Sequence, residues 1–330
     1  MGDGCHTTDY DDKKKWLGYT QELMKSVIVI IANHCSNFRK HYKKSFFVTS
    51  GTLVGLYLGY WVIHYTTLIM FADQFIIPTT SMVPTLIPGD RVIVDKTIMG
   101  ARIYTDFHFR KGGQRLDCFR TKGRRPLRHN DIAVFNFPRP KWKEISFEIN
   151  NVWCKRILAL PGDTLHIEDG FYRNNNYSGT LGLIEQQKAL ATTPDSVLIA
   201  RGVFITAWLM PIQWTVKNMG PYYIPRNGDV IRFSPNDVTL YHDIVKLETD
   251  KELTWNWEAD SAMLDGKCIE SYTFQGNYYF LAGDNVLDST DSRFWGLVPE
   301  DYIVGVVKMI FYSKNKATDK VRWDRFLKWV

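Results

Sequence analysis

The sequence predicts a mainly β protein, in which an antiparallel, barrel-like extramembrane domain carries an inserted subdomain and follows one N-terminal transmembrane helix. Three observations predict this class. A long uncharged run lies near the N-terminus, short β-branched segments bounded by Gly, Pro, Asn and Asp follow it, and a long stretch without such segments interrupts them. Aromatic residues make up 14% of the chain, which suits large apolar sheet faces.

The uncharged run FFVTSGTLVGLYLGYWVI covers residues 46–63, and apolar residues continue beyond it. At about 1.5 Å per residue, a helix of this length crosses the hydrocarbon layer, so we expect a transmembrane helix over residues 46–71. The residues just before the run are basic, namely Arg39, Lys40, Lys43 and Lys44. The first basic residue after it is Arg91. Because basic flanks stay in the cytoplasm, residues 1–45 are expected to be cytoplasmic and the rest of the chain outside.

Short strands are predicted for most of the chain beyond residue 90. The segments with alternating or β-branched residues are 91–96, 132–137, 152–160, 163–168, 230–233, 278–283 and 303–313. We expect them to form one β core from residues 72–173 and 276–330. Residues 174–275 are numerous enough to form an inserted, cap-like subdomain within that core.

Composition argues against several function classes. The five cysteines are an odd number without CxxC spacing and the eight histidines form no HExxH motif, so metal catalysis and a disulfide scaffold are both disfavoured. The net charge of +6 arises from both signs spread along the chain, and no nucleic-acid partner is expected.

The segment IIPTTSMVPTLIPGD, residues 76–90, concentrates hydroxyl groups between prolines. A serine hydroxyl needs an adjacent proton acceptor before it can act as a nucleophile. The chain has no GxSxG elbow, and no histidine lies among other catalytic features, so a Ser-His-Asp arrangement is disfavoured. The SxxK motif of Ser313 and Lys316 lies in a lysine-rich hydrophilic tail and is interpreted as solvated charge.

Lys155 is the candidate base. In the segment VWCKRILALPG, strand alternation puts Trp153 and Lys155 on one face and Cys154 and Arg156 on the other, so one of two adjacent cations faces the core. Burial disfavours an ammonium ion and can lower a lysine pKa by several units from about 10.4. A strand lysine is more often an exposed edge residue, and this segment alone leaves both interpretations open.

Three separated motifs match one family in order: IPTTSMVPTLIPGD, KRILALPGD, and GDNVLDSTDSRFWGLVP at residues 283–299. Behind a membrane anchor of this orientation, they resemble type I signal peptidases, the Ser/Lys serine proteases that remove signal peptides from exported proteins. The resemblance implies a cofactor-free serine endopeptidase in a bacterial plasma membrane, with its catalytic domain on the extracytoplasmic side. Its implied partners are preproteins that carry signal peptides and the lipid bilayer, and its implied cleavage follows small residues in an A-x-A pattern.

The resemblance also implies roles for single residues. Ser81 is the expected nucleophile, which forms an acyl-enzyme, and Lys155 is the expected neutral general base. Thr79, at a position usually occupied by serine, is expected to complete the oxyanion hole with the Ser81 backbone N–H. Ser289 is expected to hydrogen-bond to the lysine amine and orient it.

Two further groups of residues are implied near the site. The structural group is Gly283, Asp284, Asn285, Asp291 and Arg293, of which the last two match an ion pair that could equally be a weak surface pair. The residues expected to line pockets for small substrate side chains are Ile77, Pro78, Met82, Leu86, Trp153 and Cys154. From their apolar character alone, half of these could equally belong to the core.

The chain departs from the family pattern at Val286 and Asp288, which replace residues that are commonly Arg and Asn. Two alternatives therefore stay open beside a general signal peptidase. One is a specialised Ser/Lys processing peptidase of the same fold, acting on pilus or conjugation precursors. The other is a membrane-anchored binding protein without catalytic activity.

Overall fold

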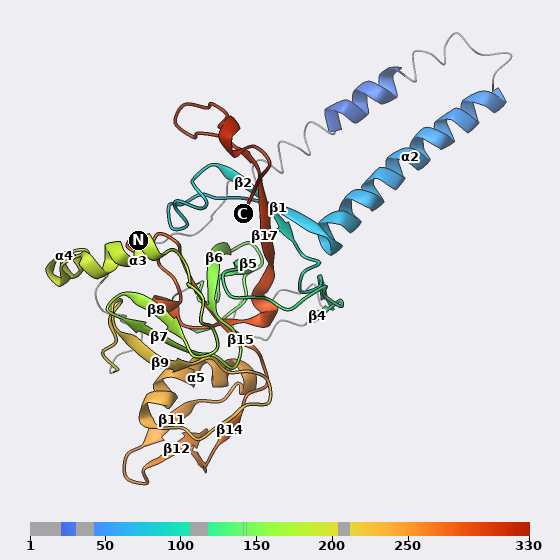
Figure 1. Ribbon diagram of the computed structural model, residues 1–330. Helices are drawn as coiled ribbons and strands as arrows, with labels where there is room; N and C mark the ends of the chain where they lie inside the picture. The colour runs from blue at the N-terminus through green and yellow to red at the C-terminus, as the bar shows by residue number, and fades with distance from the viewer. Residues whose placement is uncertain (1–20, 31–42, 106–117, 141, 143, 204–211) are drawn as a thin grey trace. The chain divides into compact units, whose positions relative to one another are not determined.

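The computed structural model describes the chain apart from residues 1–20, 31–42, 106–117, 141, 143 and 204–211 (Figure 1). The chain divides into two compact units, one ending at Ile69 and the other running from Met70 to Val330. We call them the helical unit and the β unit.

In the helical unit, residues 21–30 form one helix and α2 spans Lys43–Met70. The part of α2 from Ser50 to Met70 has a mean hydropathy of 1.4 and is long enough to cross a membrane. None of its residues is buried inside the protein, which distinguishes it from a core helix. The predicted apolar helix is therefore present as a candidate membrane span. The sequence VIVIIA at residues 27–32 is a second apolar segment, too short to span a membrane. It is helical up to residue 30, and residues 31 and 32 lie outside the described residues.

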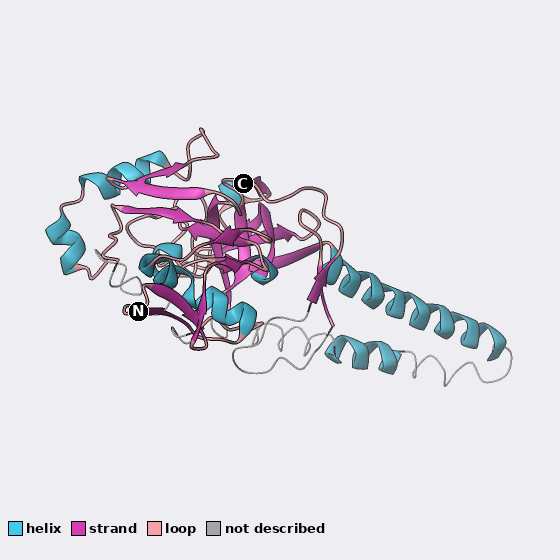
Figure 2. Ribbon diagram, turned by 90° about the horizontal axis from the view of Figure 1, so that it is seen from below, coloured by secondary structure: helices cyan, strands magenta, loops and turns pink. Residues whose placement is uncertain are grey.

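The core of the β unit is an eight-stranded sheet with the order β1-β2-β17-β5-β6-β15-β16, in which β18 pairs with β17 (Figures 1 and 2). The strands are β1 (Ala72–Ile76), β2 (Asp90–Asp95), β5 (Ile132–Asn136), β6 (Val152–Ala159), β15 (Tyr278–Ala282), β16 (Val298–Pro299), β17 (Ile303–Ser313) and β18 (Lys328–Trp329). All neighbouring pairs are antiparallel. Register shifts along β17 bend the sheet into a curled half-barrel, which confirms the predicted mainly β class.

Four smaller sheets surround this core. Their strands are β3 (Arg102–Tyr104) with β4 (Cys118–Arg120); β7 (Thr164–Glu168) between β8 (Phe171–Asn174) and β9 (Met219–Tyr223); β10 (Val230–Ile231) with β14 (Tyr272–Thr273); and β12 (Ser261–Leu264) between β11 (Leu253–Asn256) and β13 (Lys267–Ile269). The helical elements of the β unit are α3 (Ile184–Thr192), α4 (Asp195–Ala200), α5 (Pro235–Thr249), α6 (Ser292–Trp295), η2 (Glu300–Tyr302) and η3 (Trp323–Arg325).

Two hydrophobic clusters stabilise the β unit. The larger one contains Trp153 and Ile157 of β6 and continues without a break to Tyr222, Tyr241 and Phe274. The stretch predicted to be an inserted subdomain therefore shares its apolar core with the main sheet. The smaller cluster includes side chains from β2, β5 and β17 together with three residues between β1 and β2, namely Ile77, Met82 and Leu86.

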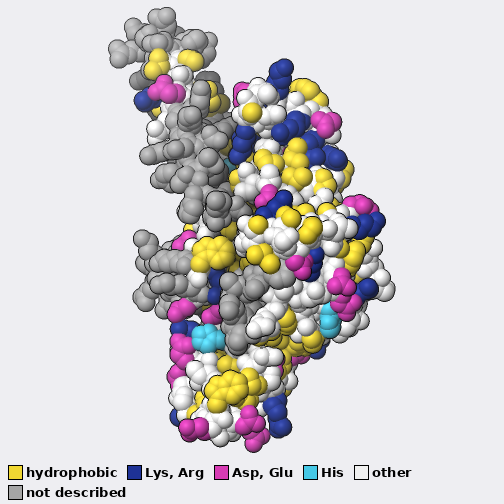
Figure 3. All heavy atoms as spheres, turned by 90° about the vertical axis from the view of Figure 1, so that its left-hand side faces the viewer, with side chains coloured by type: hydrophobic (Ala, Val, Ile, Leu, Met, Phe, Trp, Pro, Cys, Tyr) yellow, Lys and Arg dark blue, Asp and Glu magenta, His cyan; other side chains and the backbone are white. Residues whose placement is uncertain are grey.

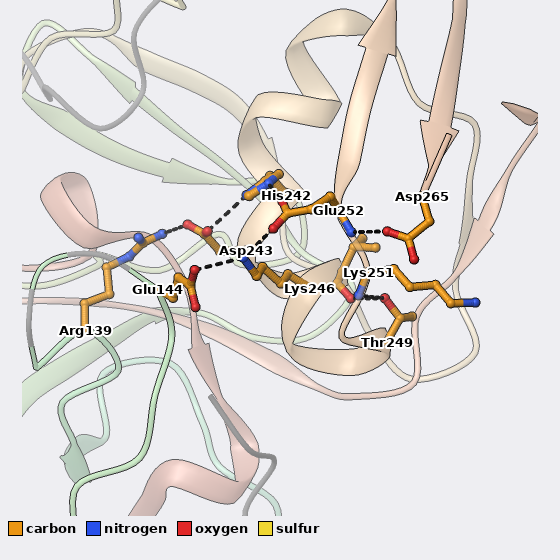
Figure 4. A network of polar contacts seen from close by, with 10 residues as sticks. Arg139, Glu144, His242, Asp243, Lys246, Thr249, Lys251, Glu252 and Asp265 are labelled. Carbon is orange, nitrogen blue, oxygen red and sulfur yellow. Dashed lines mark hydrogen bonds and ion pairs between the residues drawn. The ribbon is translucent and has the colours of Figure 1, made fainter. Parts of the chain in front are cut away.

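A polar network joins α5 to the main sheet (Figure 4). Arg139 binds Asp243 of α5 and also donates from Nε to the Trp295 carbonyl at 2.8 Å. His242 lies 3.1 Å from Asp243 and 2.7 Å from Glu252, and its hydrogen bond with Asp243 and then that with Glu252 raise the pKa of His242. Through Trp295, the network connects α5 to α6, the helix within the third motif.

The surface of the β unit is mixed in character. On the face drawn in Figure 3, hydrophobic side chains are interspersed with Lys, Arg, Asp and Glu. Three cysteines lie among the described residues, namely Cys118, Cys154 and Cys268, and none of them forms a disulfide there.

Candidate active site

Ser81 lies in the loop between β1 and β2, and this loop is closed tightly at its base. The Ile77 N–H donates to the Asp90 carbonyl at 2.8 Å, and the Gly89 N–H donates to the Ile77 carbonyl at 2.9 Å. Gly89 has a φ of +96°, and a Cβ there would lie 1.9 Å from the Lys314 carbonyl oxygen, so only glycine fits. Ser81 itself is 4% exposed.

Lys155 faces inward from the middle of β6. Its side chain is 2% exposed, whereas its neighbour Arg156 lies on the other face and pairs with Asp284 through Nε at 2.6 Å. The Lys155 amine lies 5.6 Å from the centroid of the Trp153 ring and donates to Ser81 Oγ at 2.5 Å. The structure therefore brings the predicted nucleophile and the predicted base together, although 74 positions separate them in the chain.

The third motif packs against the serine loop. The Asn285 N–H donates to the Ser81 carbonyl at 3.0 Å, and Asn285 Nδ2 donates to the Thr80 carbonyl at 3.2 Å. A Cβ at Gly283 would lie 2.1 Å from Ser289 Oγ and 2.5 Å from the Ser81 carbonyl oxygen. Glycine at 283 therefore permits this close approach of the two loops.

Asp291 and Arg293 form an ion pair with Nε–Oδ1 and Nη2–Oδ2 distances of 2.8 Å. Their side chains are 0% and 1% exposed, so the interpretation as a weak surface pair is wrong. Burial alone would raise the pKa of Asp291, but the Arg293 charge and hydrogen bonds hold it below its usual value. Asp291 also accepts the Gly283 N–H at 2.9 Å, which connects the pair directly to the loop beside Ser81.

The two predicted supporting hydroxyl groups differ in their contacts. Thr79 Oγ1 lies 3.4 Å from Ser81 Oγ, close to the expected oxyanion hole. Ser289 Oγ is buried near Gly283 and has no hydrogen-bond partner in the described part of the chain. The predicted hydrogen bond from Ser289 to the Lys155 amine is therefore absent from this structure, in which the amine donates to Ser81 Oγ. The orienting role of Ser289 stays a prediction.

The six predicted pocket residues are mostly packed. Ile77, Met82 and Leu86 are 4%, 1% and 0% exposed within the smaller cluster. Trp153 stacks on Phe137 at 4.2 Å between ring centroids and belongs to the larger cluster.

The other two pocket residues are more accessible. Pro78 is exposed and Cys154 is half-buried. Burial raises the pKa of the Cys154 thiol to about 12, so this thiol stays protonated at neutral pH. A cavity of about 150 Å³ lies elsewhere, between α5 and η2, and no predicted site residue lines it.

Sequence reasoning assigned no supporting role to three polar residues that stabilise the site, namely Thr85, Arg156 and Asp288. Arg156 Nη2 lies 2.6 Å from Asp284 Oδ2, and Thr85 Oγ1 donates to the same carboxylate oxygen. This contact joins the strand that carries Lys155 to the loop that carries Ser81. The alternation in β6 could have identified Arg156 as the outward-facing cation. Its partner Asp284 could not be identified in this way, because it lies 128 positions away in the chain. Asp288, noted only as a departure from the family pattern, accepts a hydrogen bond from Thr80 Oγ1 at 2.6 Å.

Comparisons with known proteins agree on one family. The model of the family described as "Signal peptidase, peptidase S26" matches residues 50–312. The chain is 26% identical to signal peptidase I of Buchnera aphidicola subsp. Acyrthosiphon pisum over 311 residues, covering 91% of this chain and 88% of the relative. It is 27% identical to signal peptidase I of Helicobacter pylori strain 26695 over 296 residues, covering 83% and 91% respectively.

Signal peptidase I of Aquifex aeolicus is 27% identical over 254 residues, covering 73% of this chain and 76% of the relative. Among solved structures, a signal peptidase I from Enterococcus faecalis V583 matches with a TM-score of 0.27 and 17% identity, covering 56% of this chain and 97% of that one.

Proposed function

The chain belongs to the peptidase S26 family of signal peptidases, and from this premise we propose that it cleaves signal peptides from exported preproteins with Ser81 as nucleophile and Lys155 as general base. The observation that carries the proposal is the 2.5 Å contact between Lys155 Nζ and Ser81 Oγ. Both side chains are buried, at 2% and 4% exposure, so little water competes for this contact. The family membership makes the chain a serine endopeptidase, and the contact supports its specific mechanism.

In the proposed mechanism, the neutral Lys155 amine accepts the hydroxyl proton of Ser81 as Oγ attacks the scissile carbonyl carbon. The protonated amine then donates that proton to the leaving amino group, and the mature protein departs from the acyl-enzyme. The neutral amine next takes a proton from water as the water oxygen attacks the ester carbonyl carbon. The amine then returns this proton to Ser81 Oγ as the acyl–oxygen bond breaks and the signal peptide leaves with a free carboxylate. Thr79 Oγ1 and the Ser81 backbone N–H are the proposed donors to the oxyanion.

The packing around Ser81 supports a preference for small residues before the cut. The side chains of Ile77, Met82 and Leu86, which belong to the serine loop itself, are already packed into the smaller cluster. Only small groups would fit beside them without opening the smaller cluster, since protein interiors are close-packed. We therefore propose cleavage after A-x-A-type sequences, with the substrate bound in an extended conformation.

The test of this function is cleavage of a purified preprotein by the full-length chain in detergent micelles. Replacing Ser81 by alanine should reduce the cleavage rate by more than about 1000-fold, because the nucleophile is lost. Ser196→Ala is the matched control, since Ser196 is exposed on α4, and it should leave the rate unchanged.

Other outcomes would support the alternatives. Cleavage of pilus or conjugation precursors, without cleavage of a general preprotein, would favour the specialised peptidase. Binding of preproteins without any cleavage would favour the anchored binding protein.

We also propose that α2 crosses a bacterial plasma membrane once, with the β unit on the extracytoplasmic side. Residues 1–45 would be cytoplasmic, 46–71 membrane-spanning, 72–173 with 276–330 the catalytic core, and 174–275 the cap-like insertion.

Contact of the β unit with lipid is supported by an exposed aromatic group near its C-terminus. Its residues are Trp323, Phe326 and Trp329, at 74%, 44% and 66% exposure. Lys308 lies 5.4 Å from the centroid of the Trp329 ring, and such aromatic and basic pairs suit a lipid interface.

Exposed Cys268 provides a test of this orientation. In a variant that keeps Cys268 as its sole cysteine, a membrane-impermeant maleimide should label spheroplasts but not sealed inside-out vesicles. A variant that keeps only Cys5 should show the opposite pattern, because Cys5 precedes the span. Labelling of Cys268 from the cytoplasmic side would overturn the proposed orientation.

A further inference from the structure

A second contact between two loops lies directly beside the candidate nucleophile. Thr80 Oγ1 donates to Asp288 Oδ2 at 2.6 Å, across 208 positions of the chain. Both residues are exposed, whereas Ser81, the residue after Thr80, is buried.

Backbone contacts surround this side-chain pair. The carbonyl of Thr80 accepts from Asn285 Nδ2 at 3.2 Å, and the carbonyl of Ser81 accepts from the Asn285 N–H at 3.0 Å. The Asp288 N–H donates to the Asn285 carbonyl at 3.0 Å, which closes the turn that presents the Asp288 carboxylate. We call Thr80, Asn285 and Asp288 the clasp.

The clasp holds the peptide unit that joins Thr80 to Ser81 through its carbonyl oxygen and through the Thr80 side chain. Asn285 binds the backbone carbonyl groups, and Asp288 binds the Thr80 side chain. Because Thr80 and Ser81 share one planar peptide, a rotation at Thr80 moves the Ser81 Cα and with it Oγ. A displacement of about 1 Å between reacting groups can cost 100-fold in rate, so small backbone shifts matter here.

We propose that Thr80 and Asp288 are positioning residues, which keep Ser81 Oγ within reach of the Lys155 amine by fixing the backbone before Ser81. This inference rests on the proposed function. The carboxylate strengthens the contact, since hydrogen bonds to a charged acceptor are shorter and stronger than neutral ones. Water competes at this exposed position, so the expected effect is moderate compared with loss of the Ser81 or Lys155 side chain.

The test compares variants that remove the contact with variants that preserve it. Thr80→Val keeps the β-branched shape but removes the donor, and Asp288→Ala removes the acceptor. Each should lower kcat for preprotein cleavage by about tenfold with little change in KM. Thr80→Ser and Asp288→Asn keep a donor and an acceptor, and each should retain a kcat within about threefold of wild type.

The double variant Thr80→Val with Asp288→Ala adds a further readout. If the two residues act only through each other, it should lose no more activity than either single variant. The thermal midpoint of the detergent-solubilised protein should be unchanged in all variants, because both side chains are exposed. A purely structural role would instead lower the midpoint together with the activity.

Several outcomes would overturn the inference. These are additive losses in the double variant, a change confined to KM, or equal losses in Thr80→Ser and Thr80→Val. Clasp variants with wild-type kcat, measured beside an inactive Ser81→Ala variant, would overturn the clasp and leave the proposed function intact. A wild-type protein that cleaves no precursor would overturn both.

Discussion

Replacing Lys155 by methionine is expected to reduce preprotein cleavage by more than about 1000-fold while the protein stays folded. Methionine keeps an unbranched side chain of similar length but has no lone pair that could accept the Ser81 proton. The Lys155 side chain is 2% exposed, so an apolar replacement suits its surroundings. The measurement is kcat/KM for a preprotein, together with the thermal midpoint of the detergent-solubilised protein.

Two further variants make this result specific. Lys155→Arg keeps the positive charge but stays protonated at every usable pH, so it should be as inactive as Lys155→Met. Lys251→Met is the matched control, because Lys251 is exposed, and it should retain wild-type activity. Substantial cleavage by Lys155→Arg would contradict the general-base role, since a guanidinium cannot accept the proton.

The pH dependence of the wild-type rate should follow the same chemistry. Burial of an ammonium group disfavours its charged form, and only the neutral amine can accept a proton. As the pH rises, the fraction of neutral amine increases, so kcat/KM should rise through the apparent pKa of Lys155 and then level off. A rate that falls over the same range would be inconsistent with this base.

The orientation of Lys155 illustrates what can be predicted from local sequence. Alternation along β6 requires Lys155 and Arg156 to face opposite sides, and the observed burial alternates accordingly. Trp153 and Ile157 each lie two positions from Lys155 and therefore on the same face of the strand. Because both are apolar, they favour an inward-facing lysine. The partner of Arg156 could not be predicted in this way, because Asp284 lies in another motif and meets it only in the folded sheet.

Other features depend on long-range packing. An apolar residue such as Met82 or Leu86 suits both a substrate pocket and a core, and only the folded arrangement puts them in the smaller cluster. Ser289 lies next to Gly283, but the direction of its hydroxyl depends on side-chain geometry that no motif encodes. In the inserted region, the capping box of Ser234 and Asp237 is a local signal that could have identified α5.

The buried pair of Asp291 and Arg293 gives the second large prediction, this time for stability. Replacing Arg293 by methionine should lower the free energy of unfolding by about 3 to 5 kcal/mol, because it leaves a buried carboxylate without its partner. The Asp291 side chain is 0% exposed and accepts the Gly283 N–H, so water cannot easily compensate. The measurement is urea unfolding of the detergent-solubilised chain, followed by tryptophan fluorescence.

The control for this prediction is Arg173→Met, which breaks an ion pair with Glu168 whose side chains are 65% and 59% exposed. Exposed pairs contribute about 0 to 1 kcal/mol, so this variant should unfold close to wild type. Adding Asp291→Asn to Arg293→Met removes the uncompensated charge and should restore part of the lost stability. Equal destabilisation by the buried and the exposed variants would contradict the argument.

The pH dependence of this effect has a definite sign. Arg293 lowers the pKa of Asp291 from its ordinary value of 3.8, so the folded state favours the carboxylate more strongly than the unfolded state does. The stabilisation is therefore complete above that ordinary value and is lost as the pH falls through the lower, folded-state pKa. In Arg293→Met the carboxyl loses the Arg293 charge, and burial then raises the pKa of Asp291 above its ordinary value. The stability difference between wild type and Arg293→Met should therefore be largest at neutral pH and shrink as the pH falls and Asp291 of the variant takes up a proton. A difference that stays constant from neutral pH down to about pH 4 would show that the unpartnered Asp291 carboxylate is not its cause.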